Sequence, residues 1–278
     1  MFQIFFTDLD GTLLDHHSYD YSPARPALNQ LKQEHVPLIL STSKTAAEII
    51  PFRLEIDNQD PFIVENGGSI FIPEGYFSSI PIETRKVGRF LSISHAPSYN
   101  QLQASLALLA DQHNLKVESF AEMTPSRLSE ISGLSEDHAQ LSLQREFDLP
   151  FLILDGSLNA SQFEEEAHKL GLRLTQGGRF LHLGSDTNKG QAVTQLLELC
   201  QINHADFVQS IGLGDSENDL SMLQAVHIPI VIPNPHSQST LATQLPSARI
   251  ARASGPEGWN EVVLSLLGEN PDRLIPAP

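Results

Sequence analysis

The chain has 278 residues, of which 40% are hydrophobic and 18% are charged, a composition typical of a globular protein. Its formal net charge of −17 argues against nucleic acid and anionic membranes as partners, because an acidic surface repels both. No apolar stretch reaches the roughly 18 residues of a membrane-spanning helix. The N-terminal residues MFQIFFTD lack the features of a signal peptide, so we expect a cytoplasmic protein. The single cysteine, Cys200, excludes an internal disulfide.

Strand and helix patterns alternate along the first 73 residues. The apolar runs FQIFF (2–6) and VPLIL (36–40) predict buried strands of a parallel sheet. The pair Ser22-Pro23 predicts the start of a helix, because serine is favoured at the N-cap and proline at the first helical position. Residues 61–73 predict a hairpin about an Asn-Gly-Gly turn.

The pattern changes near residue 80, and we interpret residues 81–185 as an inserted α+β domain with its own sheet. Its predicted strands cover 88–94, 150–155, 172–175 and 179–184, and its predicted helices lie around 102–109 and 159–170. The alternation resumes with a helix at 188–201, a strand at 207–212, a helix at 217–225 and a strand at 228–233. Strands alternating with helices predict an α/β fold, a doubly wound parallel-sheet (Rossmann-like) core formed by residues 1–80 and 186–278.

Ligands of such sheets bind beyond the carboxyl ends of the strands. The residues that follow the predicted core strands are Asp8 and Asp10, then Thr42, Ser43 and Lys44, then Glu65 and Asn66, and finally Asp215, Asn218 and Asp219. Several carboxylates within a few Å of one another are unfavourable without a cation. Mg²⁺, which prefers oxygen ligands, would offset that repulsion and would supply the positive charge that an acidic protein needs to bind phosphate.

Other interpretations of these segments fit less well. DLDGT (8–12) taken alone could be an ordinary turn, but a calcium loop starting at Asp8 would need glycine where Leu13 stands. GLGDSE (212–217) has glutamate at the last glycine position of a dinucleotide fingerprint, and SKT (43–45) lacks the glycines of a phosphate loop. Patterns for zinc or for a Gly-x-Ser-x-Gly nucleophile are absent from the sequence.

Four segments together resemble the motifs of haloacid dehalogenase-type phosphatases, in the right order and spacing. They are DLDGT (8–12), Thr42, Lys189 and GDSEND (214–219), and the insert matches the large α/β cap of that superfamily. Further segments are similar to mannosyl-3-phosphoglycerate phosphatases, namely STSKTAAE (41–48), PFIVENGGSIF (61–71), GGRFLHL (177–183) and NKGQAV (188–193).

The resemblance implies a Mg²⁺-dependent phosphoric monoester hydrolase. Asp8 would be the nucleophile that forms an aspartyl-phosphate, and Asp10 would first donate and then accept a proton. Thr42 and Lys189 would hold the phosphoryl oxygens. The implied ligands of Mg²⁺ are Asp8, the backbone carbonyl of Asp10, Asp215 and, through water, Asp219.

The implied substrate is a small phosphorylated glycoside, mannosyl-3-phosphoglycerate, and the product is mannosylglycerate, a compatible solute. The substrate-binding candidates are Ser43, Lys44, Asn66, Arg145, Gly178, Arg179, His182 and Asn218. A surface salt bridge is the alternative for both arginines, and packing within a strand is the alternative for His182. The cap would open and close about segments 80–84 and 184–188.

Several alternatives stay open. The substrate could be the glucosyl analogue or a range of sugar phosphates, and a phosphomutase is a further enzymatic alternative. A non-catalytic module that binds a phosphorylated metabolite is the alternative from another class of protein. We expect a monomer or a weak homodimer.

Overall fold

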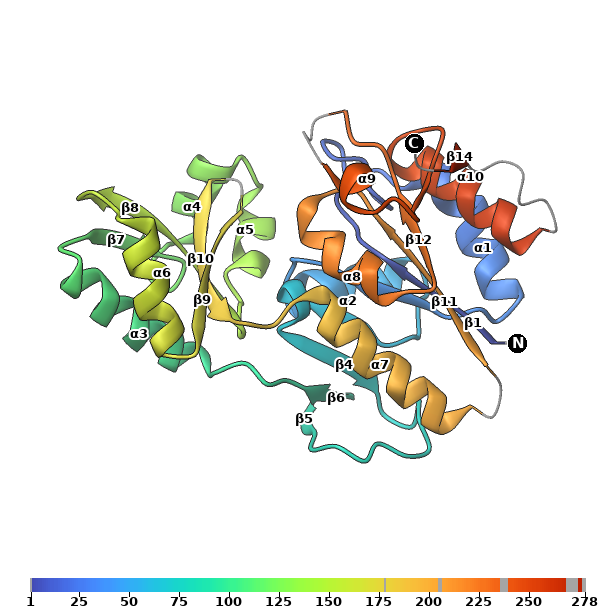
Figure 1. The fold of residues 1–278 in the computed structure, drawn as a ribbon, viewed down its shortest axis with the longest axis horizontal. Helices are drawn as coiled ribbons and strands as arrows, with labels where there is room; N and C mark the ends of the chain where they lie inside the picture. Colours follow the sequence, from blue (N-terminus) through green and yellow to red (C-terminus); the bar gives the residue numbers. More distant parts are fainter. Residues whose placement is uncertain (1, 178, 205–206, 236–239, 269–274, 277–278) are drawn as a thin grey trace. The chain divides into compact units, whose positions relative to one another are not determined.

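The computed structural model describes residues 2–177, 179–204, 207–235, 240–268 and 275–276 (Figure 1). The chain divides into two compact units, each with its own sheet. The first unit comprises Met1–Thr42, Ile56–Ile93 and Asn188–Pro278, and the second comprises Ser43–Glu55 and Ser94–Thr187. The predicted fold class, an α/β doubly wound core interrupted by an α+β insert, is confirmed.

The first unit contains a large mixed sheet. Its described strands are β1 (Phe2–Thr7), β2 (Leu38–Ser41), β3 (Phe62–Val64), β4 (Ser69–Pro73), β5 (Arg85–Val87), β6 (Phe90–Ile93), β11 (Val208–Gly214), β12 (Ile228–Val231), β13 (Arg249–Ile250) and β14 (Ile275–Pro276). Their spatial order is β14-β13-β12-β11-β1-β2-β3-β4-β6-β5.

The middle of this sheet is parallel, which brings several strand ends to one edge. Strand β1 pairs in parallel with β11 on one side and with β2 on the other. In this register Thr7, the last residue of β1, lies opposite Leu213 and Leu40. The residues that follow β1, β2 and β11 therefore emerge at the same edge, which is the position at which an open α/β sheet binds its ligand.

Helices cover both faces of the sheet (Figure 1). The described helices of the first unit are η1 (Ser22–Ala24), α1 (Arg25–Gln33), η2 (Glu65–Gly67), α7 (Lys189–Asn203), η3 (Glu217–Asp219), α8 (Leu220–Ala225), α9 (Leu241–Gln244) and α10 (Gly255–Leu267). Helices α7 and α8 share a hydrophobic core with Ile4 and Phe6 of β1. Because side chains alternate along a strand, Thr7 points to the opposite face, where it accepts a hydrogen bond of 3.0 Å from Trp259 of α10. Helix α1 packs against α10 on that face.

The second unit is built on an antiparallel sheet of order β7-β8-β10-β9. Its described elements are α2 (Ala46–Glu55), α3 (Tyr99–Gln112), β7 (Lys116–Ser119), α4 (Pro125–Ser132), α5 (Glu136–Ser142), β8 (Asp148–Asp155), α6 (Ala160–Lys169), β9 (Leu172–Gly177) and β10 (Phe180–Ser185). Phe151 and Phe163 join a core with helix α3, whereas Leu152, the next residue along β8, packs against a cluster that includes α4 and α5.

Three details of the expected organisation differ from the structure. Residues 43–55, which we expected in the core domain, group with the second unit. Residues 90–93 form β6, which pairs with β4 in the large sheet, so the strand that we expected at 88–94 in the insert belongs to the first unit. A strand pattern indicates burial but not the neighbouring strand, which explains the error. Ser22 does not cap an α-helix; its hydroxyl donates to Asp20 at 2.6 Å, and a short 3-10 helix precedes α1.

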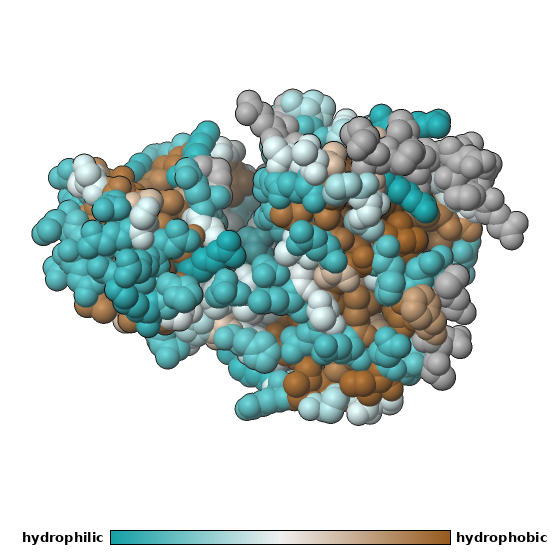
Figure 2. All heavy atoms as spheres, viewed as in Figure 1, coloured by the Kyte–Doolittle hydropathy of each residue, from teal (hydrophilic) through white to brown (hydrophobic). Residues whose placement is uncertain are grey.

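No helix of the described residues is long and apolar enough to cross a membrane. Hydrophilic residues cover most of the face drawn in Figure 2, and hydrophobic residues lie among them in smaller groups.

Gly190, the second residue of α7, permits a close approach to α8. A Cβ atom at this position would lie 2.2 Å from the backbone oxygen of Ser221, so the two helices could not keep their separation. We expect Gly190→Ala to cost about 1–3 kcal/mol or more of unfolding free energy and to lower the melting temperature by about 5 °C. Gly184→Ala is the matched control, because its Cβ would meet nothing closer than 3.6 Å. Equal thermal shifts for the two variants would contradict the close approach.

Candidate active site

Three carboxylates and a lysine meet at the edge where β1 and β11 end. Asp8 follows β1, Asp215 follows β11, and Asp219 ends the short helix η3. Lys189, the first residue of α7, donates from Nζ to Asp8 Oδ1 at 2.6 Å and to Asp219 Oδ1 at 2.7 Å. All four side chains are buried, and Lys189 and Asp219 have no exposed surface. The structure thus brings together residues from both ends of the sequence, as predicted.

A tight turn after Asp8 places its neighbours against Asp215. Leu9 accepts hydrogen bonds from the amides of Thr12 (3.1 Å) and Leu14 (2.8 Å), which closes the turn. Gly11 has a φ of +85°, a conformation that favours glycine, and a Cβ there would lie 2.8 Å from Asp215 Oδ2. The hydroxyl of Thr12 donates to Asp215 Oδ1 at 3.1 Å. Gly11 and Thr12 therefore seat the first loop against Asp215.

Asp219 holds the loop that carries Asp215. Its Oδ2 accepts hydrogen bonds from the amides of Asp215 (3.0 Å) and Ser216 (3.2 Å). The side-chain amide of Asn234, which follows β12, donates to Asp215 Oδ2 at 2.6 Å. Asp215 is thus fixed from two sides, and Asp219 is engaged at both of its oxygens.

The start of α7 positions Lys189. Asn188 caps the helix by accepting from the amide of Gln191 at 3.0 Å, and the Gln191 side chain accepts from the Asn188 amide at 3.1 Å. A Cβ at Gly67 would lie 2.2 Å from the Asn188 carbonyl oxygen, so the turn after β3 packs directly on this helix start. The buried lysine is therefore anchored by a capping box and by a neighbouring turn.

The loop after β2 is tied to the loop after β3. The amide of Thr42 donates to Ile63 O at 3.1 Å, and Thr42 O accepts from the amide of Asn66 at 3.0 Å. Asn218 donates to the Asn66 side chain at 3.2 Å. Thr42 is buried, whereas Asn218 is exposed and contacts Asn66.

The cluster carries an excess of negative charge. Burial raises the pKa of Asp8 well above its usual range; Asp219 raises it further and Lys189 opposes the rise. Burial likewise raises the pKa of Asp215, with Asp219 as the next cause. Burial alone would lower the pKa of Lys189, but the attraction of Asp219 and Asp8 outweighs burial and holds it above its ordinary value. One ammonium group does not balance three buried carboxylates.

The donor set fits a divalent cation. Carboxylate oxygens of Asp8, Asp215 and Asp219 lie within 4.8 Å of one another, and all three residues are buried. Oxygen ligands of this kind suit Mg²⁺, whose charge would offset the excess described above. Because Asp219 already accepts from a lysine and two amides, a water-mediated role fits it better than direct ligation. Asp10 is half-buried in the same turn.

The remaining predicted residues lie in the second unit, apart from Gly178, which is outside the described residues. His182 contacts Asp148 at 2.7 Å, and Asp148 also forms an ion pair of 3.2 Å with Arg145. Arg179 is exposed, and both Ser43 and Lys44 are half-buried. Two of the expected sugar-binding side chains therefore share a protein carboxylate.

Sequence reasoning missed two contributors to the cluster, Thr12 and Asn234. Both donate to Asp215. Asn234 could have been found with the rule that we applied to the other strands, because it comes shortly after the carboxyl end of β12.

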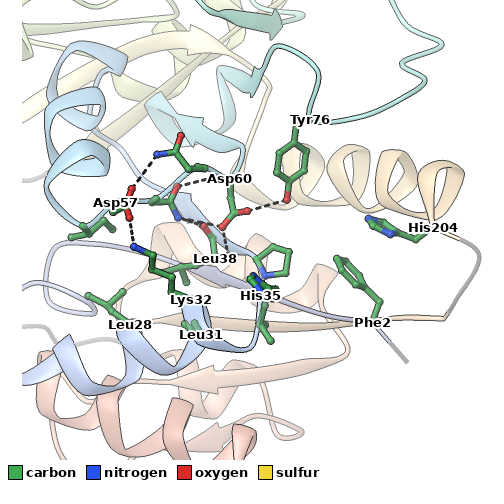
Figure 3. Close-up of a pocket in the computed structure, with 15 residues that line it drawn as sticks. Phe2, Leu28, Leu31, Lys32, His35, Leu38, Asp57, Asp60, Tyr76 and His204 are labelled. Atoms are coloured by element: carbon green, nitrogen blue, oxygen red, sulfur yellow. Dashed lines mark hydrogen bonds and ion pairs between the residues drawn. The ribbon is translucent and has the colours of Figure 1, made fainter.

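A hollow of about 430 Å³ lies at the opposite edge of the large sheet (Figure 3). Phe2 and Leu38, the first residues of β1 and β2, line it, together with Tyr76 and His204. Asp60 accepts there from the Tyr76 hydroxyl at 3.0 Å. This hollow is at the amino ends of the parallel strands, so it is separate from the acid and lysine cluster.

Comparison with known proteins identifies the class of enzyme to which this fold and cluster belong. Residues 5–243 match the family model of haloacid dehalogenase-like hydrolases, and the chain belongs to that family. The protein is a phosphoric monoester hydrolase.

Two relatives have a more specific name than the family model. The chain is 38% identical over 270 residues to a glucosyl-3-phosphoglycerate/mannosyl-3-phosphoglycerate phosphatase of Methanococcoides burtonii, covering 97% of this chain and 99% of the relative. It is 36% identical to an enzyme of the same name from Persephonella marina, covering 96% and 97%. A haloacid dehalogenase-like hydrolase from Bacteroides thetaiotaomicron has the same fold, with a TM-score of 0.65 at 17% identity over 96% of this chain and 100% of that one.

Proposed function

We propose that the protein hydrolyses mannosyl-3-phosphoglycerate and its glucosyl analogue to the hexosylglycerate and phosphate, in a Mg²⁺-dependent reaction. The observation that carries the proposal is the buried cluster of Asp8, Asp215, Asp219 and Lys189 at the carboxyl edge of the sheet. The substrate class rests on the names of the two relatives, which include both sugars.

In the proposed mechanism Asp8 attacks the phosphorus atom, and the bond from phosphorus to the glycerate oxygen breaks. Asp10 protonates the leaving oxygen, which releases the hexosylglycerate. Asp10 then takes a proton from a water molecule that attacks phosphorus, and Asp8 is regenerated. Lys189 holds Asp8 at 2.6 Å and compensates negative charge that develops during transfer.

The residues that would hold Mg²⁺ are Asp8, the backbone carbonyl of Asp10, Asp215 and, through water, Asp219. When bound, the cation would supply positive charge that reduces repulsion between the substrate phosphate and these carboxylates. The hydroxyl of Thr42 would hold a phosphoryl oxygen. It belongs to the first unit, as do the acids.

The glycerate carboxylate is a second anion and needs its own donor. Lys44, with Ser43, is our candidate, and Asn66 and Asn218 are further polar candidates in the first unit. For the sugar we keep Arg179 and Gly178, whereas the contacts of Arg145 and His182 with Asp148 favour another role for these two side chains.

The test is phosphate release from mannosyl- and glucosyl-3-phosphoglycerate, with 3-phosphoglycerate and glucose 6-phosphate as comparison substrates. We expect both hexosyl compounds to be hydrolysed with Mg²⁺, and EDTA to abolish release until Mg²⁺ is restored in excess. Appearance of a second phosphorylated sugar in place of free phosphate would identify a phosphomutase instead. Binding of the phosphorylated compounds without turnover would identify a binding module.

A further inference from the structure

The guanidinium of Arg145 is attached to the backbone of the segment that carries Lys44. Arg145 lies between α5 and β8, and its side chain is 6% exposed. Its Nη2 and Nη1 donate to the carbonyl oxygen of Ser43 at 2.9 Å and 3.3 Å. The same Nη2 lies 3.2 Å from Asp148 Oδ2. The arginine therefore links a carbonyl group of residue 43 to a carboxylate of the second sheet.

His182 completes this link from the neighbouring strand. Its Nδ1 lies 2.7 Å from Asp148 Oδ2, and β10 pairs with β8 in antiparallel register. Asp148 is thus held between a guanidinium and an imidazole, both on the second unit. A planar guanidinium that spans two acceptors is fixed in orientation more strongly than a lysine would be.

A second hydrogen bond joins this segment to helix α5, at Thr45. The Thr45 hydroxyl donates to the carbonyl of Leu141 in α5 at 3.0 Å, and the Thr45 amide donates to Glu48 at 2.8 Å. Ser43 and Thr45 are therefore both bonded to residues of the second unit that precede β8.

The preceding residue, Thr42, belongs to the first unit and is bonded within it. Thr42 O accepts from the amide of Asn66, whereas Ser43 O accepts from Arg145. Two successive carbonyl groups are thus bonded to different units, and the chain passes from one unit to the other at the Thr42–Ser43 peptide.

We infer that Arg145 is a positioning residue. By holding the Ser43 carbonyl it fixes the backbone that presents Lys44, and it attaches the segment Ser43–Glu55 to the rest of the second unit. Arg145 would thereby orient Lys44 for pairing with the glycerate carboxylate of the substrate. The part of this inference that concerns the carboxylate rests on the proposed function.

The first test needs no substrate. Amide hydrogen–deuterium exchange of residues 43–50 is compared in wild type, Arg145→Ala and Arg127→Ala, the last being a control because Arg127 pairs with Glu118 elsewhere on the second unit. We expect Arg145→Ala to raise exchange by about ten-fold or more, and the control to leave it unchanged. Arg145→Lys, which cannot span both acceptors, serves if the alanine variant does not fold, and it should raise exchange less. Unchanged exchange in the folded variant overturns the inference.

The second test separates positioning from direct binding. Arg145→Ala should raise KM for mannosyl-3-phosphoglycerate about ten-fold, and should change kcat/KM for p-nitrophenyl phosphate, which has no carboxylate, by less than about three-fold. In a Lys44→Ala background the same substitution should add less than about two-fold to KM, because it acts through Lys44. Additive effects would show that Arg145 contacts the substrate itself and would overturn the inference. If wild type shows no preference for hexosyl phosphoglycerates, the proposed function fails while the exchange measurement still decides the role of Arg145.

Discussion

Asp8→Asn is expected to lower kcat by at least about 10,000-fold, because the amide cannot serve as the nucleophile. We expect the substitution not to destabilise the folded protein. The substitution removes one of three buried like charges, and Lys189 keeps its contact of 2.7 Å with Asp219. The measurement is steady-state phosphate release, together with a thermal melt of each variant.

Asp15→Asn is the matched control for this experiment. Asp15 is a half-buried acid in the same loop, and it accepts hydrogen bonds from Ser18 rather than from the cluster. We expect its kcat to stay close to the wild-type value. Turnover by Asp8→Asn within about ten-fold of wild type would rule out Asp8 as the nucleophile.

Lys189→Met is expected to impair both stability and turnover. The methionine has a similar length but leaves Asp8 and Asp219 buried without their cation, and removal of one partner from a buried ion pair costs about 3–5 kcal/mol. A loss of that size corresponds to a decrease of about 10 °C in melting temperature for a chain of this length. Loss of the charge that stabilises transfer should lower kcat by about 1,000-fold.

Lys32→Met provides the comparison for stability. Lys32 also pairs with an aspartate, Asp57, but both side chains are more than half exposed. Exposed ion pairs contribute little, so the melting temperature should hardly change. Equal decreases in melting temperature for Lys189→Met and Lys32→Met would contradict a central electrostatic role of the buried Lys189.

Much of the first unit could be predicted from sequence because its signals are local. The apolar run before Asp8, the Asn-Gly-Gly turn after Glu65 and the helix start at Asn188 each contain their own turn or cap residues. The acids were predictable because parallel strands bring their carboxyl ends to one edge. That rule needs only the order of strands and helices along the chain.

The rest depends on tertiary contacts that no local pattern encodes. The sequence of residues 90–93 predicts a strand, but it does not indicate that this strand joins the large sheet. The helix after β2 follows a core strand, yet it groups with the second unit, where Thr45 contacts Leu141 of α5. Arg145 and His182 have residue types that suit a sugar site, but only the structure shows that Asp148 lies between them.

The most direct test of the central claim is the ratio of kcat/KM for mannosyl-3-phosphoglycerate to kcat/KM for glucose 6-phosphate, measured with Mg²⁺. Both compounds are hexose-containing phosphate monoesters, but only the first carries a glycerate carboxylate. We predict a ratio of at least about 100, because a site built to pair with a second anion discriminates strongly against a substrate that lacks it. A ratio near one, or a ratio unaffected by Lys44→Ala, would contradict the account.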